Sequence, residues 1–192
     1  MFELSKVLKL KPTMEWIIKD DDPRIRLKAE DLTFPLTKKD YEAISKMVSF
    51  IDSSYDGSYE EHNIRPGVAI ASVQINYLKK VIYLHFDDEN IVEKKWLLAN
   101  PKIVYFSDEV IYLNTGEGCL SVPEDRNGYV PRKSKIKVEA IDLFSNTNVI
   151  IEESNYSAIV LQHEIDHLNG ILYYDHINVL DPYYNKEDWK KI

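Results

Sequence analysis

The chain has 192 residues, of which 44% are hydrophobic and 29% charged, so we expect one globular domain, residues 1–192, with a sizeable core. Its formal net charge of −8 disfavours a general nucleic-acid binder, with no direct DNA contact expected, and disfavours a basic membrane-surface helix. The single cysteine excludes an internal disulfide, and the chain shows neither a membrane-spanning apolar run nor a signal peptide, which together predict a cytoplasmic protein.

The first half of the chain passes from irregular structure through a helix into strands. Residues 1–36 are interrupted by prolines and predict no regular element. A helix is predicted over residues 37–52, because Thr37 suits the N-cap and hydrophobic residues recur at helical spacing. β-branched and aromatic residues then predict strands at about 68–72, 80–86, 96–99, 102–106, 110–114, 135–143 and 147–152. Asn146 indicates a hairpin between the last two.

Helical character returns over residues 154–168, with Ser154 or Asn155 as the cap and Gly170 beyond the end. Apolar residues cover most of the circumference of this helix, which predicts burial among strands on several sides. A short strand near 171–174 and a polar tail follow. The predicted fold is therefore α+β, with mixed and antiparallel β-sheets wrapped around a central buried helix and an additional N-terminal helix.

This central helix carries the run QHEIDH at residues 162–167, which contains the pattern H-E-x-x-H. His163 and His167 are four residues apart and share one helix face, where two imidazoles can hold one metal ion. Glu164 adjoins the first histidine and can act as a general base toward a metal-bound water. The pattern is short, and the alternative interpretation is a pair of partly buried histidines on an amphipathic helix.

A tetrahedral hydrolytic metal needs a third protein ligand and one open position. Tyr173 stands six residues beyond His167, where zinc proteases usually carry a histidine, and Glu187 is the only glutamate downstream. Cys119 is the better candidate, because glycines precede it in TGEGCLS at residues 115–121 and permit unusual backbone conformations. The alternative is that Cys119 is an inert buried thiol.

A third stretch, GVAIASVQ at residues 67–74, ends at Gln74, whose amide either stabilises an oxyanion or is simply solvated. Together with EGCLS at residues 117–121 and QHEIDH, it resembles the three ordered motifs of the peptide deformylase family, G-x-G-x-A-A-x-Q, E-G-C-L-S and Q-H-E-x-D-H. The second and third motifs are intact, whereas Ala69 and Ser72 depart from the first. The similarity runs from about residue 23 to residue 177 and is strongest to the Gram-positive-like, type 2 branch.

The resemblance implies a metal-dependent hydrolase that removes the formyl group from formyl-methionyl nascent polypeptides and releases formate. It implies three metal ligands, namely Cys119, His163 and His167. Glu164 would activate a metal-bound water, while the metal, Gln74 and the Leu120 backbone N–H would stabilise the oxyanion. The ligand set fits zinc, but the family generally works with Fe2+, so we expect Fe2+ with Zn2+ or Ni2+ as substitutes.

The resemblance also implies that an extended peptide adds beside a strand and that its methionine side chain enters an apolar pocket. The matching positions are Gly67, Val68, Leu113, Glu117, Gly118, Tyr156, Ile159 and Val160. Asp166 is expected to brace a ligand or a loop, or else to lie at the surface. Three further histidines match no motif and are expected to be ordinary surface or strand residues, namely His62, His85 and His176.

The expected partners are formyl-methionyl N-termini and, as a further candidate, the ribosome near its exit tunnel. The tail at residues 189–191 either contacts ribosomal RNA or is a frayed terminus, and we favour fraying. Two other functions compete. A zincin-type endopeptidase requires a downstream ligand and keeps its metal after Cys119→Ala. If Ala69 and Ser72 displaced Gln74, the chain would instead be a relative without catalytic activity, although the intact Glu164 argues against this alternative.

Overall fold

The computed structural model describes residues 2–192. The helices and strands are, in chain order, α1 (Lys38–Tyr55), α2 (Tyr59–His62), β1 (Ala69–Ala71), β2 (Val81–Asp87), β3 (Glu93–Phe106), β4 (Val110–Tyr112), β5 (Arg132–Lys133), β6 (Lys135–Asp142), β7 (Thr147–Ser154), α3 (Asn155–Leu168) and β8 (Lys190–Lys191). Short 3-10 helices span Leu4–Lys6, Met14–Trp16, Pro23–Arg26, Ser72–Ile75 and Tyr173–His176. Within residues 2–192, no helix combines the length and the apolarity needed to cross a bilayer.

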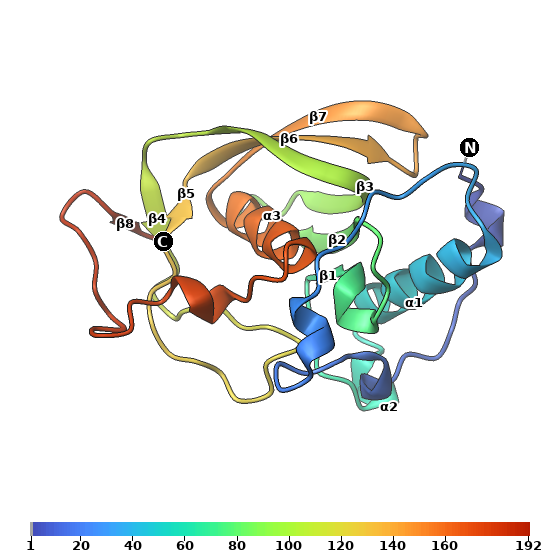
Figure 1. Cartoon of the computed structure of the whole chain (residues 1–192), viewed down its shortest axis with the longest axis horizontal. Coiled ribbons are helices and arrows are strands. Elements are labelled where there is room, and N and C mark those ends of the chain that lie inside the picture. The colour runs from blue at the N-terminus through green and yellow to red at the C-terminus, as the bar shows by residue number, and fades with distance from the viewer. Residues whose placement is uncertain (1) are drawn as a thin grey trace.

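The strands form two sheets around α3. The larger sheet is antiparallel throughout, with the order β1-β2-β3-β6-β7, so β1 is an edge strand. The smaller sheet has the order β5-β4-β8 and is mixed, because β4 and β8 run parallel. Figure 1 shows α3 enclosed by the curved strands and α1 set apart from it. The prediction of an α+β fold is confirmed.

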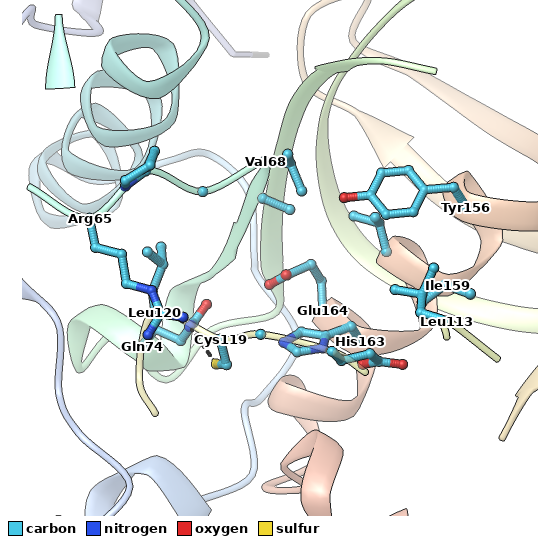
Figure 2. A pocket seen from close by; sticks show the side chains of 16 residues that line it. Arg65, Val68, Gln74, Leu113, Cys119, Leu120, Tyr156, Ile159, His163 and Glu164 are labelled. Carbon is cyan, nitrogen blue, oxygen red and sulfur yellow. Dashed lines mark hydrogen bonds and ion pairs between the residues drawn. The ribbon is translucent and has the colours of Figure 1, made fainter. Parts of the chain in front are cut away.

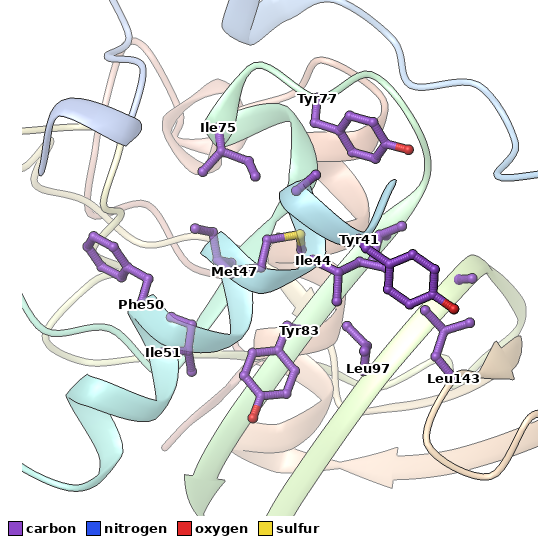
Figure 3. Close-up of a cluster of buried hydrophobic side chains, with 14 of the residues drawn as sticks. Tyr41, Ile44, Met47, Phe50, Ile51, Ile75, Tyr77, Tyr83, Leu97 and Leu143 are labelled. Atoms are coloured by element: carbon purple, nitrogen blue, oxygen red, sulfur yellow. The ribbon is translucent and has the colours of Figure 1, made fainter. Parts of the chain in front are cut away.

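The larger sheet is buried on both faces near β2. Tyr83 of β2 packs in the cluster formed with α1, whereas its neighbour Leu84 packs in the cluster formed with α3. Figure 3 shows Ile44 and Met47 of α1 facing Tyr83, and all three side chains are fully buried. Because successive side chains of a strand point to opposite faces, β2 is apolar along nearly its whole length. This packing places α1 on one face of the larger sheet and α3 on the other.

Helix α1 has Thr37 as its N-cap, at the predicted start, and it extends three residues beyond the predicted end at residue 52. The Thr37 side chain accepts a hydrogen bond from the Asp40 backbone N–H, and the Asp40 carboxylate accepts one from the Thr37 N–H. This reciprocal capping satisfies two of the N–H groups that a helix start leaves without partners. The helix then continues to Tyr55, before Gly57 adopts a positive φ of 83°.

Two predicted strands, 96–99 and 102–106, are one strand, β3. Asn100 has a left-handed φ of 54°, and the pairing with β6 shifts between Ala99 and Lys102. This bulge accommodates Pro101, which cannot donate to the ladder, without ending the strand. The hairpin predicted between the last two strands is confirmed, and Asn146 in its turn has a φ of 57°.

The strand predicted near 171–174 is wrong, because the chain forms the 3-10 helix Tyr173–His176 there. Gly170, with a φ of 75°, lies beyond the end of α3 as expected. The Asp175 carboxylate then accepts from the Leu172 N–H, and the Asp175 N–H donates to the Leu172 carbonyl, which closes a tight turn. The favoured fraying of the tail is also wrong, because Lys190–Lys191 form β8 beside β4.

Candidate metal centre

Three donor side chains meet between α3 and the loop that precedes β5. The ligand atoms of Cys119, His163 and His167 all lie within 4.8 Å of one another, and all three residues are buried. Cys119 Sγ is 3.2 Å from His167 Nε2, and the centroids of the two imidazole rings are 4.9 Å apart. The structure thus brings together the three residues that the sequence proposed as ligands.

The cysteine is presented by a tight turn. The Val122 N–H donates to the Cys119 carbonyl at 3.1 Å, and the Ser121 N–H points at Cys119 Sγ at 3.4 Å. A Cβ added to Gly67 would lie 3.1 Å from the Leu120 side chain, so the segment that leads into β1 packs closely on the cysteine loop. A larger residue at position 67 would force the Leu120 side chain to move by a few tenths of an ångström.

An ion pair that the sequence did not predict supports His163. Its Nδ1 lies 2.8 Å from Glu117 Oε2, and Arg132 Nε and Nη2 donate to the two Glu117 oxygens at 2.8 and 3.0 Å. Burial alone would raise the pKa of Glu117, but the charges of Arg132 and His163 outweigh it and lower that pKa to about 2. The ionised carboxylate accepts the His163 Nδ1–H, so the Nε2 proton of the charged ring is the one that a metal ion would replace.

His167 lacks such a support. Within residues 2–192 no group hydrogen-bonds to its buried Nδ1. Burial, followed by the charge of His163, holds the pKa of His167 well below its usual range, so its ring is neutral and its Nε2 lone pair is available. One thiol and two imidazoles in a buried cluster match the donor set of a four-coordinate divalent metal with one open position. The residues fit a metal ion.

Glu164 lies in the wall of the same site with one oxygen unengaged. The residue is only 4% exposed, and its Oε2 has no hydrogen-bond partner within the described part of the chain. Burial raises the pKa of Glu164 to about 7, with the charge of Glu117 adding to the effect and those of His163 and Arg132 opposing it. A carboxyl group with this pKa can both accept and return a proton near neutral pH.

Gln74 is held at both ends of its side chain. Its Oε1 accepts from the Ala71 N–H at 2.8 Å, and its Nε2 points to Cys119 Sγ at 3.5 Å and to Ser121 Oγ at 3.2 Å. Ser72, a departure from the family motif, is fully buried and donates to the Lys79 carbonyl. The altered motif therefore leaves Gln74 ordered, with its N–H group beside the cysteine (Figure 2).

A pocket of about 260 Å³ opens above these groups (Figure 2). It is lined by Gln74, Cys119, Leu120, His163 and Glu164, together with all eight residues that the sequence proposed for substrate binding, Gly67, Val68, Leu113, Glu117, Gly118, Tyr156, Ile159 and Val160. The sequence analysis did not propose Arg65, Pro66 and Ala69, which also line it. Their signal was their position beside Gly67 and Val68 in the first motif.

Two further residues have roles that the sequence indicated only in part. Among the residues that the structure describes, no hydrogen bond joins Asp166 to a metal-ligand side chain, and Asp166 instead pairs with Arg132 Nη1 at 2.5 Å and with His176 Nε2 at 2.8 Å. Tyr173 stacks on the His163 ring with centroids 6.0 Å apart and planes 17° from parallel. Arg132 itself follows Pro131 at the start of β5, and no sequence pattern identified it.

Known proteins resemble this chain over nearly its whole length. The family described as polypeptide deformylase matches residues 14–182. A peptide deformylase from Malacoplasma penetrans is 45% identical over 184 residues, which cover 96% of this chain and 98% of that protein. Peptide deformylase 2 from Bacillus subtilis is 41% identical over 177 residues, covering 92% of this chain and 96% of that protein.

Solved structures show the same fold. A probable peptide deformylase from Synechococcus phage S-SSM7 superimposes with a TM-score of 0.67 at 33% identity, covering 83% of this chain and 97% of that one. A class I type b peptide deformylase from Acinetobacter baumannii, solved with Met-Ala-Ser bound, gives a TM-score of 0.68 at 28% identity, covering 88% and 100%. The predicted resemblance is confirmed, and the chain belongs to the peptide deformylase family.

Proposed function

We propose that this chain is a metal-dependent hydrolase that removes the formyl group from formyl-methionyl nascent polypeptides and releases formate. Membership in the family supports this reaction. The observation that carries the proposal is the meeting of Cys119, His163 and His167 beside the unengaged Glu164 carboxyl at one pocket. The Met-Ala-Ser bound in the Acinetobacter baumannii relative supports a peptide that begins with methionine as the product.

The proposed metal ligands are Cys119, His163 and His167. A bound divalent ion supplies Lewis acidity toward the formyl oxygen and acidifies a water molecule. We propose Fe2+ on the family resemblance, with Zn2+ or Ni2+ as substitutes that the same thiol and imidazole donors accept.

Glu164 is the proposed proton carrier. It takes a proton from the attacking water and returns it to the amine that leaves, and a pKa of about 7 suits both steps. The Gln74 side-chain N–H and the Leu120 backbone N–H are proposed to stabilise negative charge on the formyl oxygen. In comparable sites one such donor lowers the barrier by about 2.7–4 kcal/mol.

The peptide is proposed to add beside β1, which is the edge strand of the larger sheet. Val68, Ile159 and Val160 provide apolar walls for the methionine side chain. Because the Glu117 carboxylate is engaged by Arg132 and His163, we propose that Glu117 supports the metal ligand while its backbone borders the substrate.

The proposed setting is the cytoplasm, where formyl-methionyl chains leave the ribosome, and the ribosome near its exit tunnel is the proposed partner. Cosedimentation of the protein with ribosomes tests that contact. The pairing of β8 with β4 holds Lys190 and Lys191 in a fixed strand, in which Lys190 is paired with Glu109 and Lys191 would be the cation offered to the ribosome.

The decisive assay is formate release from formyl-Met-Ala-Ser by iron-loaded protein handled without oxygen. We expect Glu164→Ala to keep its metal and to lose at least about 100-fold in rate. Glu187→Gln is the matched control, because an endopeptidase with a downstream ligand would lose its metal there, whereas a deformylase would not. A metal-loaded protein that releases no formate would contradict the proposal and favour a relative without catalytic activity.

A further inference from the structure

A continuous path of polar contacts connects His176 with the proposed ligand His163. His176 Nε2 lies 2.8 Å from Asp166 Oδ2, and Arg132 Nη1 lies 2.5 Å from the same oxygen. Arg132 holds Glu117 through two bonds of 2.8 and 3.0 Å, and Glu117 Oε2 lies 2.8 Å from His163 Nδ1. The path joins the 3-10 helix Tyr173–His176, α3, β5 and the cysteine loop.

The donor and the acceptor of each hydrogen bond in this path are fixed by the chemistry of the groups. Carboxylates only accept and a guanidinium only donates, so the ring nitrogens facing Asp166 and Glu117 must both carry protons. His163 therefore holds its proton on Nδ1, which leaves the Nε2 lone pair for the metal. The orientation and the tautomer of His163 thus depend on where Glu117 sits, and the position of Glu117 depends on Arg132.

Arg132 is placed by Asp166 as much as by Glu117. The guanidinium is almost fully buried, and its three hydrogen bonds divide between the two carboxylates. The Asp166 side chain, however, is 20% exposed and borders a second cavity of about 700 Å³ on another face of α3. The His176 side chain also lines this cavity and occupies Asp166 Oδ2, where water would otherwise compete with Arg132.

The turn that carries His176 is itself firmly held. Asp175 pairs with Arg26 and caps the Leu172 N–H, while Tyr173 is 1% exposed and stacks on the His163 ring. His176 therefore meets Asp166 from a backbone position that the fold fixes in advance, which lowers the entropy cost of the contact.

We propose that His176 is a positioning residue of the metal site, which acts through Asp166, Arg132 and Glu117 to keep the Nε2 of His163 directed at the metal. The inference rests on the metal ligands of the proposed function, but it concerns the orientation of a ligand rather than the reaction. Mutation of a residue that hydrogen-bonds directly to a metal-binding histidine commonly lowers the metal affinity about 10–100-fold. His176 lies further from the metal, so we expect about a 3–10-fold effect.

The experiment uses zinc-loaded protein, which is diamagnetic and inert to oxygen, and follows two readouts. The first is the proton NMR signal of the His163 Nδ1–H, which reports its hydrogen bond to Glu117. The second is the rate at which zinc transfers to a chelator. The variants are His176→Ala, His176→Phe, which keeps a ring without a donor, and His176→Gln, which restores an N–H donor at similar reach. His62→Ala is the matched control, because this half-buried histidine lies outside the path.

We expect the Ala and Phe variants to shift or broaden the His163 proton signal and to release zinc about 3–10-fold faster, with the Gln variant and the control close to the parent protein. An unchanged signal and release rate in both the Ala and Phe variants would overturn the role of His176, as would a folded Gln variant that restores neither. A parent protein that retains no zinc would overturn this inference and the proposal that zinc substitutes at the site, whatever the formate assay gives. Retention of zinc without formate release would overturn only the proposed function.

Discussion

Replacing Arg132 with methionine tests whether the buried ion pair stabilises the fold. The side chains of Arg132 and Glu117 are 3% and 4% exposed, and Asp166 is 20% exposed. Methionine replaces the aliphatic part of the arginine side chain but carries no charge, so the variant leaves one fully buried carboxylate and one partly buried carboxylate without their cation. Breaking a buried pair in this way costs about 3–5 kcal/mol, because the remaining charge is uncompensated.

The pKa of Glu117 shows the direction of the same effect. Burial alone would raise this pKa, yet Arg132 and His163 lower it from 4.5 to about 2. The direction of this shift means that the charged carboxylate is favoured in the folded protein only while its cationic partners are present. A loss of about 3–5 kcal/mol should lower the melting temperature of the variant by about 6–20 °C.

Urea denaturation of the metal-free proteins measures the loss without a contribution from metal binding. Lys135→Met is the matched control, because the pair of Lys135 with Glu152 is about half exposed and should change stability by less than about 1 kcal/mol. The double variant Arg132→Met/Glu117→Gln should be more stable than Arg132→Met alone, since it leaves no buried carboxylate at position 117. A single variant that loses under about 1 kcal/mol, or a double variant less stable than the single, would refute the reasoning.

Three further outcomes follow from the structure. Burial raises the pKa of Asp40, but the hydrogen bonds from Tyr77 and Thr37, together with the charge of Lys79, outweigh it and lower that pKa below 3.8. The stabilising effect is therefore present above pH 3.8 and lost below it. Asp40→Asn should flatten the acid side of the stability profile, and an unchanged profile would contradict this. Gly170→Ala should cost more than about 2 kcal/mol in urea denaturation, because φ is 75° and the new Cβ would lie 2.2 Å from the Arg26 carbonyl oxygen. Ile44→Ala leaves a cavity in the fully buried cluster and should cost about 2–5 kcal/mol by the same assay; a loss below about 1 kcal/mol would mean that the core refills.

The elements that the sequence predicted well are those whose signals are local. The capping pair of Thr37 and Asp40 and the helical spacing after it located α1. The turn at Asn146 located the β6–β7 hairpin. The failures have non-local causes. The sequence predicted that the strand ends at Pro101, but the strand continues through a bulge at Asn100. The Asn100 side chain is held there by hydrogen bonds with the backbone of Leu32, which is far away in the sequence.

The distinction between local and non-local signals also applies to the residues of the site. Spacing along a helix and a resemblance across three motifs proposed the donor atoms, and the fold brings them within 4.8 Å of one another. Arg132 carries no comparable pattern, since its importance comes from meeting Glu117 and Asp166, which lie 15 positions before it and 34 positions after it. His176 was expected to be ordinary for the same reason. Residues that act through tertiary contacts produce no periodic pattern in the sequence.

The burial of α3 explains why the site needs these supports. An i, i+4 pair places two imidazoles side by side, but each ring still rotates about its side-chain bonds and has two tautomers. The surrounding sheet fixes the backbone of α3, and the Glu117 carboxylate then fixes the His163 ring. A carboxylate buried beside the metal can remain ionised only with a cation next to it, and Arg132 supplies that charge. The buried helix therefore requires a buried ion pair, and that pair extends the metal site across α3 to Asp166 and His176 on its other face.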